Sequence, residues 1–122
     1  MKIFSIDHVQ IAIPEGSENE AREFYINALG FAEIPKPANL AKRGGVWLQY
    51  ENVQLHLGVE KDFHPARKAH PAFLVDNLDD FISKAKSFGI EMDTSQPELN
   101  GFNRMYIFDP FGNRIELMGE IK

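Results

Sequence analysis

The sequence predicts an α+β fold in which one structural unit of about 60 residues occurs twice. The order strand, helix, three strands can be followed along the first half of the 122-residue chain and again along the second. Both expected helices end in a glycine between two large apolar residues, Leu29-Gly30-Phe31 and Phe88-Gly89-Ile90, and the two glycines are 59 residues apart. We therefore expect one domain, residues 1–122, with a first module at 1–60, a connector at 61–67 and a second module at 68–122.

Alternating apolar and polar side chains predict that the first module begins with a strand over 3–13, with Val9, Ile11 and Ile13 on one face. A helix is expected to start at Ser17, because Glu20 stands three residues later, as in a capping box. The remaining elements are a short strand, a loop rich in Pro, Lys, Arg and Gly, and two strands joined by a turn, at 31–34, 35–45, 46–50 and 53–59.

The second module follows the same plan. Its first strand is expected at 69–75, and Asn77 is expected to cap a helix that Gly89 ends. An apolar stripe along this helix predicts that one side packs on the sheet. The remaining elements are a short strand, a loop and two strands around a turn, at 90–93, 94–101, 104–108, 114–118 and 109–113.

Composition narrows the chemistry that the chain can perform. It contains no cysteine, which excludes disulfides, cysteine nucleophiles, iron–sulfur clusters and thiolate zinc sites. The net charge of −5 argues against a broad nucleic-acid-binding surface. No apolar run approaches the roughly 20 residues of a membrane helix. Asp7 interrupts the start of the chain, so we expect no signal peptide and a cytoplasmic protein.

Four side chains of metal-ligand type lie at equivalent positions in the two modules. His8 and His70 are 62 residues apart, and His56 and Glu116 are 60 residues apart. Each lies on the strand face opposite the apolar side chains, so the four can converge if the strands curl into one sheet. Their nitrogen and oxygen atoms suit one divalent ion such as Zn, Ni, Co, Mn or Fe(II). The fourth histidine, His64, lies in the connector and is expected to be solvated.

Three stretches carry a resemblance to a known family: Asp7-His8-Val9, Phe24 to Phe31, and Asp109 to Leu117, which is the most specific. In these stretches the chain resembles the vicinal oxygen chelate superfamily, which includes glyoxalase I, fosfomycin-resistance enzymes, extradiol dioxygenases and bleomycin-resistance proteins. The resemblance covers nearly the whole chain. It implies two βαβββ modules that form a curved mixed sheet, a cup around one divalent metal, with the helices outside.

The resemblance also implies roles for the four candidate ligands. Recurrent ligands of the superfamily correspond to His8, His70 and Glu116. A fourth position, which is a glutamate in glyoxalase I, is His56 here, as a ligand or as a neighbour of one. Glu116 is implied as the catalytic base. The implied activity is metal-dependent lyase or isomerase chemistry on a small oxygenated metabolite. The alternatives are a bleomycin-like binding protein without turnover and a fosfomycin-type thiol transferase.

Four further side chains are candidates for substrate binding. Trp47 and Gln49 share a face of one expected strand, and Arg104 and Tyr106 share a face of another. If these faces point into the cup, Arg104 pairs with a carboxylate or phosphate and Trp47 stacks on a planar group. Otherwise Trp47 belongs to the core and Arg104 to a solvated edge. The expected partner is a small molecule rather than a nucleic acid or a membrane, and the resemblance implies a homodimer.

Overall fold

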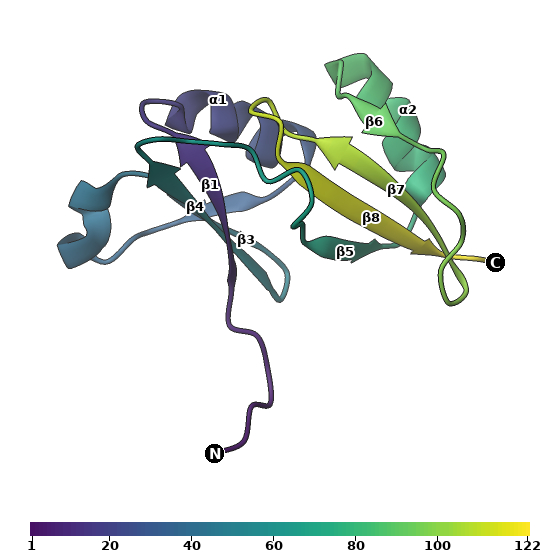
Figure 1. Cartoon of the computed structure of the whole chain (residues 1–122), viewed down its shortest axis with the longest axis horizontal. Helices are drawn as coiled ribbons and strands as arrows, with labels where there is room; N and C mark the ends of the chain where they lie inside the picture. The colour runs from purple at the N-terminus through teal and green to yellow at the C-terminus, as the bar shows by residue number, and fades with distance from the viewer. The chain divides into compact units, whose positions relative to one another are not determined.

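The computed structural model describes all 122 residues, and they form two compact units, Met1–His64 and Pro65–Lys122 (Figure 1). The boundary between the units falls inside the predicted connector at 61–67. Each unit contains its own four-stranded sheet and its own helix. None of the helices is long and apolar enough to cross a membrane.

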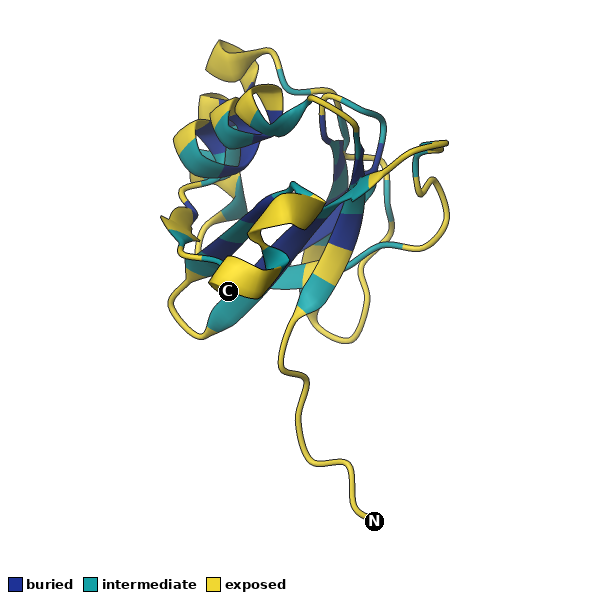
Figure 2. Ribbon diagram, turned by 90° about the vertical axis from the view of Figure 1, so that its left-hand side faces the viewer, coloured by how far each residue is buried: buried dark blue, intermediate teal, exposed yellow.

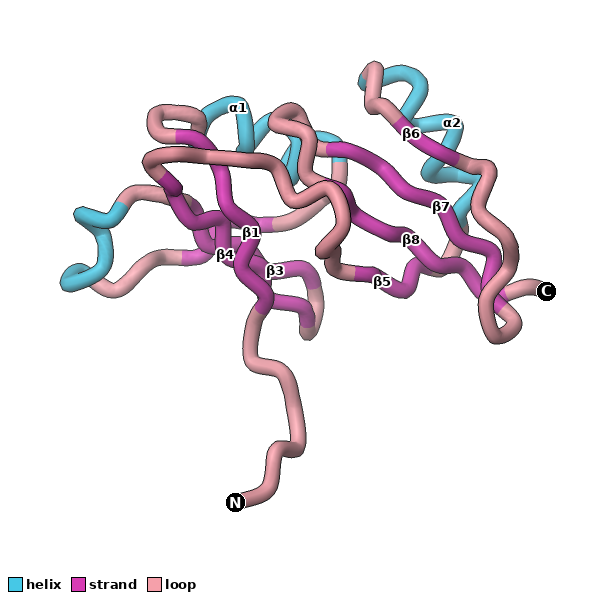
Figure 3. Tube along the Cα trace, in the orientation of Figure 1, coloured by secondary structure: helices cyan, strands magenta, loops and turns pink.

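The first unit has the strand order β1-β4-β3-β2, in which β1 and β4 are parallel and the other pairs are antiparallel. Figure 3 shows the strands of this sheet in magenta, with β1, β3 and β4 labelled. An α-helix followed directly by a π-helix connects the first two strands, and a 3₁₀-helix precedes the third. In chain order the elements are β1 Val9–Pro14, α1 Glu18–Arg22, η1 Glu23–Ala28, β2 Ala32–Ile34, η2 Ala38–Arg43, β3 Val46–Tyr50 and β4 Val53–Glu60.

The second unit repeats this arrangement, with the strand order β5-β8-β7-β6 and one parallel pair, β5 with β8. The other two pairs are antiparallel. The predicted α+β fold with one unit used twice is therefore confirmed. The elements are β5 Ala72–Val75, α2 Leu78–Phe88, β6 Met92–Asp93, β7 Phe102–Phe108 and β8 Arg114–Glu120.

The core of the first unit lies on one face of its sheet, as the alternation predicted. Ile13 on β1, Leu48 on β3 and Leu55 on β4 are fully buried, and so is Tyr25 on η1. Figure 2 shows buried stretches in dark blue along the strands. Because successive side chains of a strand point to opposite faces, the neighbours of these residues lie on the other face. That second face carries the candidate site residues of the first unit.

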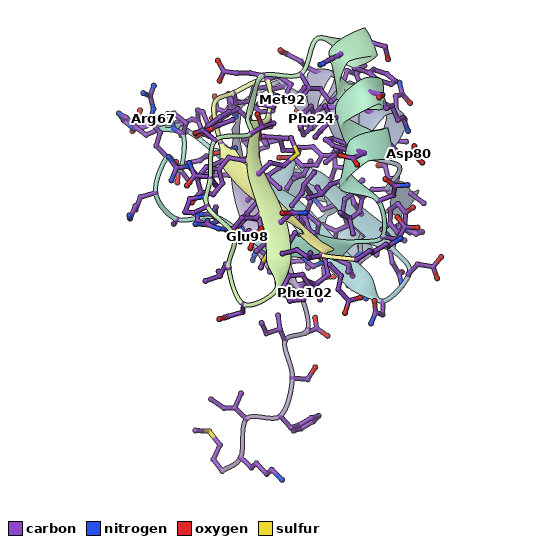
Figure 4. All side chains as sticks on the ribbon, turned by 90° about the vertical axis from the view of Figure 1, so that its right-hand side faces the viewer. Phe24, Arg67, Asp80, Met92, Glu98 and Phe102 are labelled. Carbon is purple, nitrogen blue, oxygen red and sulfur yellow. The ribbon has the colours of Figure 1, made fainter.

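In the second unit, α2 contacts the sheet at β8. Asn77 caps the helix as predicted, since its side-chain oxygen accepts a hydrogen bond from the Asp80 N–H at 3.0 Å. Figure 4 shows Asp80 on the outer side of α2 and Phe102 at the beginning of β7. A Cβ atom at Gly119 of β8 would stand 3.0 Å from Leu78 Cγ, so this glycine permits the close approach of α2 to the sheet.

Three details differ from the sequence expectation. The first strand begins at Val9, and residues 1–8 form an exposed extended segment that enters no sheet ladder. The Ser17 side chain caps no helix N–H; its hydroxyl donates to the Pro14 carbonyl at 2.6 Å instead. The helix that follows widens into a π-helix over Glu23–Ala28, in which the Leu29 N–H bonds to the Phe24 carbonyl.

Candidate metal centre

His70 and Glu116 come together in the second unit. Glu116 lies within β8 and is 5% exposed, and its partner on the parallel strand β5 is Ala72. His70 stands two residues before Ala72 and therefore points to the same face of the sheet. The backbone supports this placement, because the Glu116 N–H donates to the Pro71 carbonyl at 3.0 Å. As a result, His70 Nε2 lies 2.8 Å from Glu116 Oε1.

The hydrogen bonds of His70 indicate whether a proton or a cation can join His70 Nε2 to Glu116 Oε1. Its Nδ1 lies 2.8 Å from the Lys68 carbonyl oxygen, which can only accept, so Nδ1 carries the proton. In a neutral imidazole, Nε2 then presents a lone pair to a carboxylate oxygen. Two acceptors at this distance need a proton or a cation to join them. A metal-ligating histidine has this same pattern, with its other ring nitrogen donating to a backbone carbonyl.

The second oxygen of Glu116 has no hydrogen-bond partner although it is buried. Its nearest charged neighbour is Arg104, whose Nη1 stands 3.5 Å from Oε2, an ion-pair distance longer than a good hydrogen bond. Leaving a buried carboxylate oxygen without a donor costs free energy. Glu116 thus offers an oxygen that a ligand, such as a cation, would satisfy.

Two arginines and one tyrosine form a cluster on the strand face that carries this carboxylate. Tyr106 of β7 is directly opposite Glu116 in the antiparallel pair. The Arg114 guanidinium carbon stands 4.5 Å from the centre of the Tyr106 ring, and the Arg104 carbon stands 6.0 Å from it. Arg104 Nη1 donates to the Tyr106 hydroxyl at 3.3 Å, whereas the buried Arg114 Nε has no partner. The cluster is suited to an anionic group close to Glu116.

The turn before β8 fixes the start of this strand. Asp109 Oδ1 accepts hydrogen bonds from the N–H groups of Phe111 and Asn113, at 3.0 and 2.9 Å. Asn113 Nδ2 donates to Asp109 Oδ2 at 2.8 Å, and Asn113 Oδ1 accepts from the Ala66 N–H at 2.9 Å. The Arg114 N–H also donates to the Ala66 carbonyl at 3.0 Å. The turn therefore ties the chain before β5 to β8, next to the His70–Glu116 pair.

The first unit holds a stack of three aromatic rings. His56 of β4 lies between Trp47 of β3 and His8, which directly precedes β1. The Trp47 and His56 ring centroids are 4.0 Å apart with an interplanar angle of 7°. The His8 and His56 centroids are also 4.0 Å apart, at 15°. The two covering rings leave His56 only 6% exposed, with Nε2 lacking a hydrogen-bond partner.

The environments of the two histidines in this stack differ. His8 Nδ1 lies 2.9 Å from Asp7 Oδ2, so a carboxylate orients the ring and leaves Nε2 for another partner. His8 is 40% exposed at its side chain. Desolvation lowers the pKa of His56 below the usual 6.5, and the positive field of a protonated His8 lowers this pKa further.

The structure brings the predicted residues together in two groups. Trp47, His8 and His56 are in contact in the first unit, and Arg104, Tyr106, His70 and Glu116 are in contact in the second. Gln49 shares the face of Trp47, but its Nε2 donates to the Glu51 carbonyl at 3.0 Å. The connector residues His64 and Arg67 are exposed, and Figure 4 shows Arg67 extending away from the strands.

Sequence reasoning missed two contributors to these groups. Arg114 stands two residues before Glu116 on β8, so alternation places both side chains on one face and was a sufficient signal. The Lys68 carbonyl, which holds the proton of His70 on Nδ1, left no signal because a backbone acceptor is invisible in a pattern of side chains.

The donor atoms fit a divalent cation in their chemistry. Imidazole nitrogens and one carboxylate are the ligands that Zn, Mn, Fe(II), Co and Ni take. Three buried side-chain atoms have no hydrogen-bond partner, and two of them, His56 Nε2 and Glu116 Oε2, belong to these same residues; the third is Arg114 Nε. No three His, Asp or Glu side chains, however, form a group that could hold a metal ion. His70 and Glu116 alone would therefore be an incomplete ligand set, and a metal ion there would need at least one further donor.

A comparison with known protein families places the chain in one of them. The sequence profile of the Glyoxalase/Bleomycin resistance protein/Dioxygenase superfamily matches residues 5–117. The chain belongs to this superfamily. No protein with a curated description matches it.

Several solved structures are similar to this chain. A protein assigned to the glyoxalase family from Bacillus anthracis is 48% identical, with a TM-score of 0.89 over 98% of each chain. A glyoxalase family protein from Enterococcus faecalis is 25% identical, with a TM-score of 0.74 over 93% of this chain and 96% of that one. The fosfomycin resistance protein FosX from Listeria monocytogenes, as the E126Q mutant complexed with Mn(II) and 1S,2S-dihydroxypropylphosphonic acid, has a TM-score of 0.80 at 18% identity. That match covers 98% of this chain and 94% of the FosX chain, and it shows the shared fold.

Proposed function

We propose that the protein is a divalent-metal-dependent enzyme that binds a small oxygenated metabolite and catalyses proton transfer of the lyase or isomerase type. The observation that carries the proposal is the part-buried contact of 2.8 Å between His70 Nε2 and Glu116 Oε1, which brings two atoms of metal-ligand type together while the Lys68 carbonyl holds the other ring nitrogen. His8, with Asp7 on its Nδ1, is the proposed third ligand. Membership of the superfamily supports this reading, as does FosX, a protein of the same fold whose structure contains Mn(II).

The proposed mechanism assigns a task to each side chain near Glu116. A bound metal ion would supply Lewis acidity, which stabilises negative charge on a chelated substrate oxygen. Arg104 binds an anionic group of the substrate, and Tyr106 orients Arg104 through their 3.3 Å hydrogen bond. Glu116 accepts a substrate proton at Oε2, the carboxylate oxygen that has no hydrogen-bond donor.

On the first unit we propose Trp47 and Gln49 as further substrate contacts. His56 covers one face of the Trp47 ring, which leaves the other face for a planar or apolar group. The Gln49 side-chain N–H is engaged with Glu51, so this residue would contribute its carbonyl oxygen as an acceptor.

Metal analysis of the purified protein tests the proposal. We expect one divalent ion per site in the wild type, and we expect H70A and E116Q to lose it. The matched control is H64A, because His64 is an exposed histidine whose Nδ1 contacts only the Asp62 carbonyl. A wild type that neither contains nor binds any of the five candidate metals would refute the proposal. A metal content in H64A equal to that of H70A would also contradict the assigned ligands.

A second candidate function is a fosfomycin-type thiol transfer. The observation that favours it is the pair of guanidiniums around Tyr106, because two arginines suit a phosphonate. An assay panel separates the candidates: methylglyoxal with glutathione or bacillithiol, methylmalonyl-CoA, and fosfomycin with the same thiols. Turnover of fosfomycin with a thiol, and of neither other substrate, supports the transferase. Turnover of methylglyoxal or of methylmalonyl-CoA supports the lyase or isomerase. Tight ligand binding without turnover would instead identify a bleomycin-type binding protein.

We also propose a homodimer. Residues 1–6 extend away from the sheet of the first unit as an arm, which Figure 2 shows as exposed, and Ile3, Phe4 and Ile6 are 83, 88 and 78% exposed. Three large apolar side chains on one short arm favour burial against a second copy of the chain. Light scattering tests this, with an expected mass of twice 13.9 kDa and a monomer after deletion of residues 1–6.

A further inference from the structure

The ring stack of the first unit distinguishes between two roles for His56. The sequence left open whether this histidine is a metal ligand or a neighbour of one. His8 and His56 both carry an imidazole, and both were predicted to bind the same ion. Their mutual geometry, 4.0 Å between centroids and 15° between planes, bears directly on whether they can do so.

An imidazole binds a metal ion through a lone pair that lies in the plane of its ring. One ion shared by two imidazoles must therefore lie near both ring planes, about 2 Å from each nitrogen. The two rings are stacked with their centroids 4.0 Å apart and their planes inclined by 15°, so for face-to-face stacking the planes meet about 15 Å from the rings, which is 4.0 Å divided by the tangent of 15°. In this stack, an ion in the plane of His8 is out of reach of the His56 lone pair.

The surroundings of the two rings indicate which one serves the metal. His8 is partly exposed and is oriented by Asp7 through Nδ1, as a ligand is by its outer neighbour. His56 is 6% exposed and is covered on both faces, by Trp47 at 4.0 Å and by His8 at 4.0 Å. Its cross-strand partner is Trp47, so β3 and β4 hold these two rings in register.

We infer that His56 is a positioning residue and not a ligand: it is a planar spacer that transmits the rigid position of Trp47 to the ring of His8. This inference rests on the proposed metal-dependent function. The ring of His56 matters in this role and its nitrogens do not. A planar ring without nitrogen should therefore replace it, whereas a branched aliphatic side chain should not.

Two variants test this distinction through the affinity for the metal ion, measured by titration with Mn²⁺ or Zn²⁺. H56F keeps a flat ring between Trp47 and His8, and we expect its dissociation constant to stay within about threefold of the wild type. H56L removes the stack, and we expect binding to weaken by roughly 10- to 100-fold, as for other residues that orient a metal ligand. Equal losses in H56F and H56L would overturn the inference. H64F is the matched control, and it should not change the affinity.

A measurement on the wild type keeps the inference falsifiable even if H56F folds poorly. Pulsed electron paramagnetic resonance of the Cu²⁺-loaded protein counts the coordinated imidazoles. We expect two, from His8 and His70, and one fewer in H8A. A count of three in the wild type would overturn the inference and leave the proposed function intact. A wild type that binds no metal would refute both, so the two failures are distinguishable.

In the metal-free protein, nuclear magnetic resonance gives a further readout. The ring current of His56 should shift the carbon-bound protons of the His8 ring, because the two rings are stacked. We expect this shift to persist in H56F and to disappear in H56L. A His8 shift that is the same in all three proteins would show that the spacer does not exist in solution, and it would overturn the inference.

Discussion

Replacing Asn113 with alanine tests whether the turn before β8 supports the second unit. Asn113 is 1% exposed, and its side chain donates a hydrogen bond to the Asp109 carboxylate and accepts one from the Ala66 N–H. A hydrogen bond to a charged group contributes about 2 kcal/mol and a neutral one about 1 kcal/mol, so N113A should lower the free energy of unfolding by about 3 kcal/mol. With a urea m-value of about 2 kcal/mol/M, the midpoint should fall by about 1.5 M.

Urea unfolding followed by circular dichroism measures this loss, and two variants accompany it. N103A removes an exposed asparagine of β7 and should change the free energy of unfolding by less than about 0.5 kcal/mol. N113D keeps an acceptor for Ala66 but places a second carboxylate beside Asp109, so it should be at least as unstable as N113A. A loss below about 1 kcal/mol in N113A, or a stable N113D, would refute the reasoning that this turn ties the chain before β5 to β8.

Three further predictions concern pH, substrate charge and packing. Folding lowers the pKa of His56, so neutral His56 contributes its full share of stability above the pKa of about 6.5 that it has in the unfolded chain. This stability is lost as the pH falls through the pKa of the folded state. Urea midpoints measured from pH 8 to 5 should therefore fall more steeply in the wild type than in H56F. R104M should weaken binding of the anionic substrate that the assay panel identifies by roughly 10- to 100-fold, while R67M, in the connector, should leave it unchanged. G119A should cost about 1 to 2 kcal/mol of stability, because its Cβ would stand 3.0 Å from Leu78 Cγ, and this cost should shrink in a background of L78A if crowding is the cause.

The strand faces could be predicted from sequence because alternation depends on local geometry alone. On β7 and β8, the side chains of Met105, Ile107 and Ile115 are at most 1% exposed. Tyr106 and Glu116 lie on the opposite face of the same strands. The same rule works for Asn77, whose cap depends only on the backbone three residues later. Features that depend on a few consecutive residues were therefore accessible without a structure.

The departures occur where a more distant partner competes with a local one. Ser17 and Glu20 have the spacing of a capping box, yet the Ser17 hydroxyl bonds to the Pro14 carbonyl, which the turn after β1 brings within reach. Ile3 and Ile6 have strand-forming side chains, but β4 pairs with β1 only from Val9 onward, so the residues before it have no ladder to join. Local propensity cannot decide such cases because the competing group comes from another part of the fold.

The candidate site shows the same division at the level of single atoms. Alternation placed His56 and Trp47 on one face and could not reveal that their rings stack, because stacking depends on the register of β3 with β4. Residue types suggested that every histidine on such a face is a ligand. The orientation of the ring plane is a stricter criterion than residue type, since the lone pair of a ligating nitrogen must point at the ion. His56 is stacked on His8 with 4.0 Å between centroids and 15° between planes, so it supports the ring of His8 instead of sharing its ion. The identity of a donor can thus be read from sequence, whereas its direction follows from the packing around it.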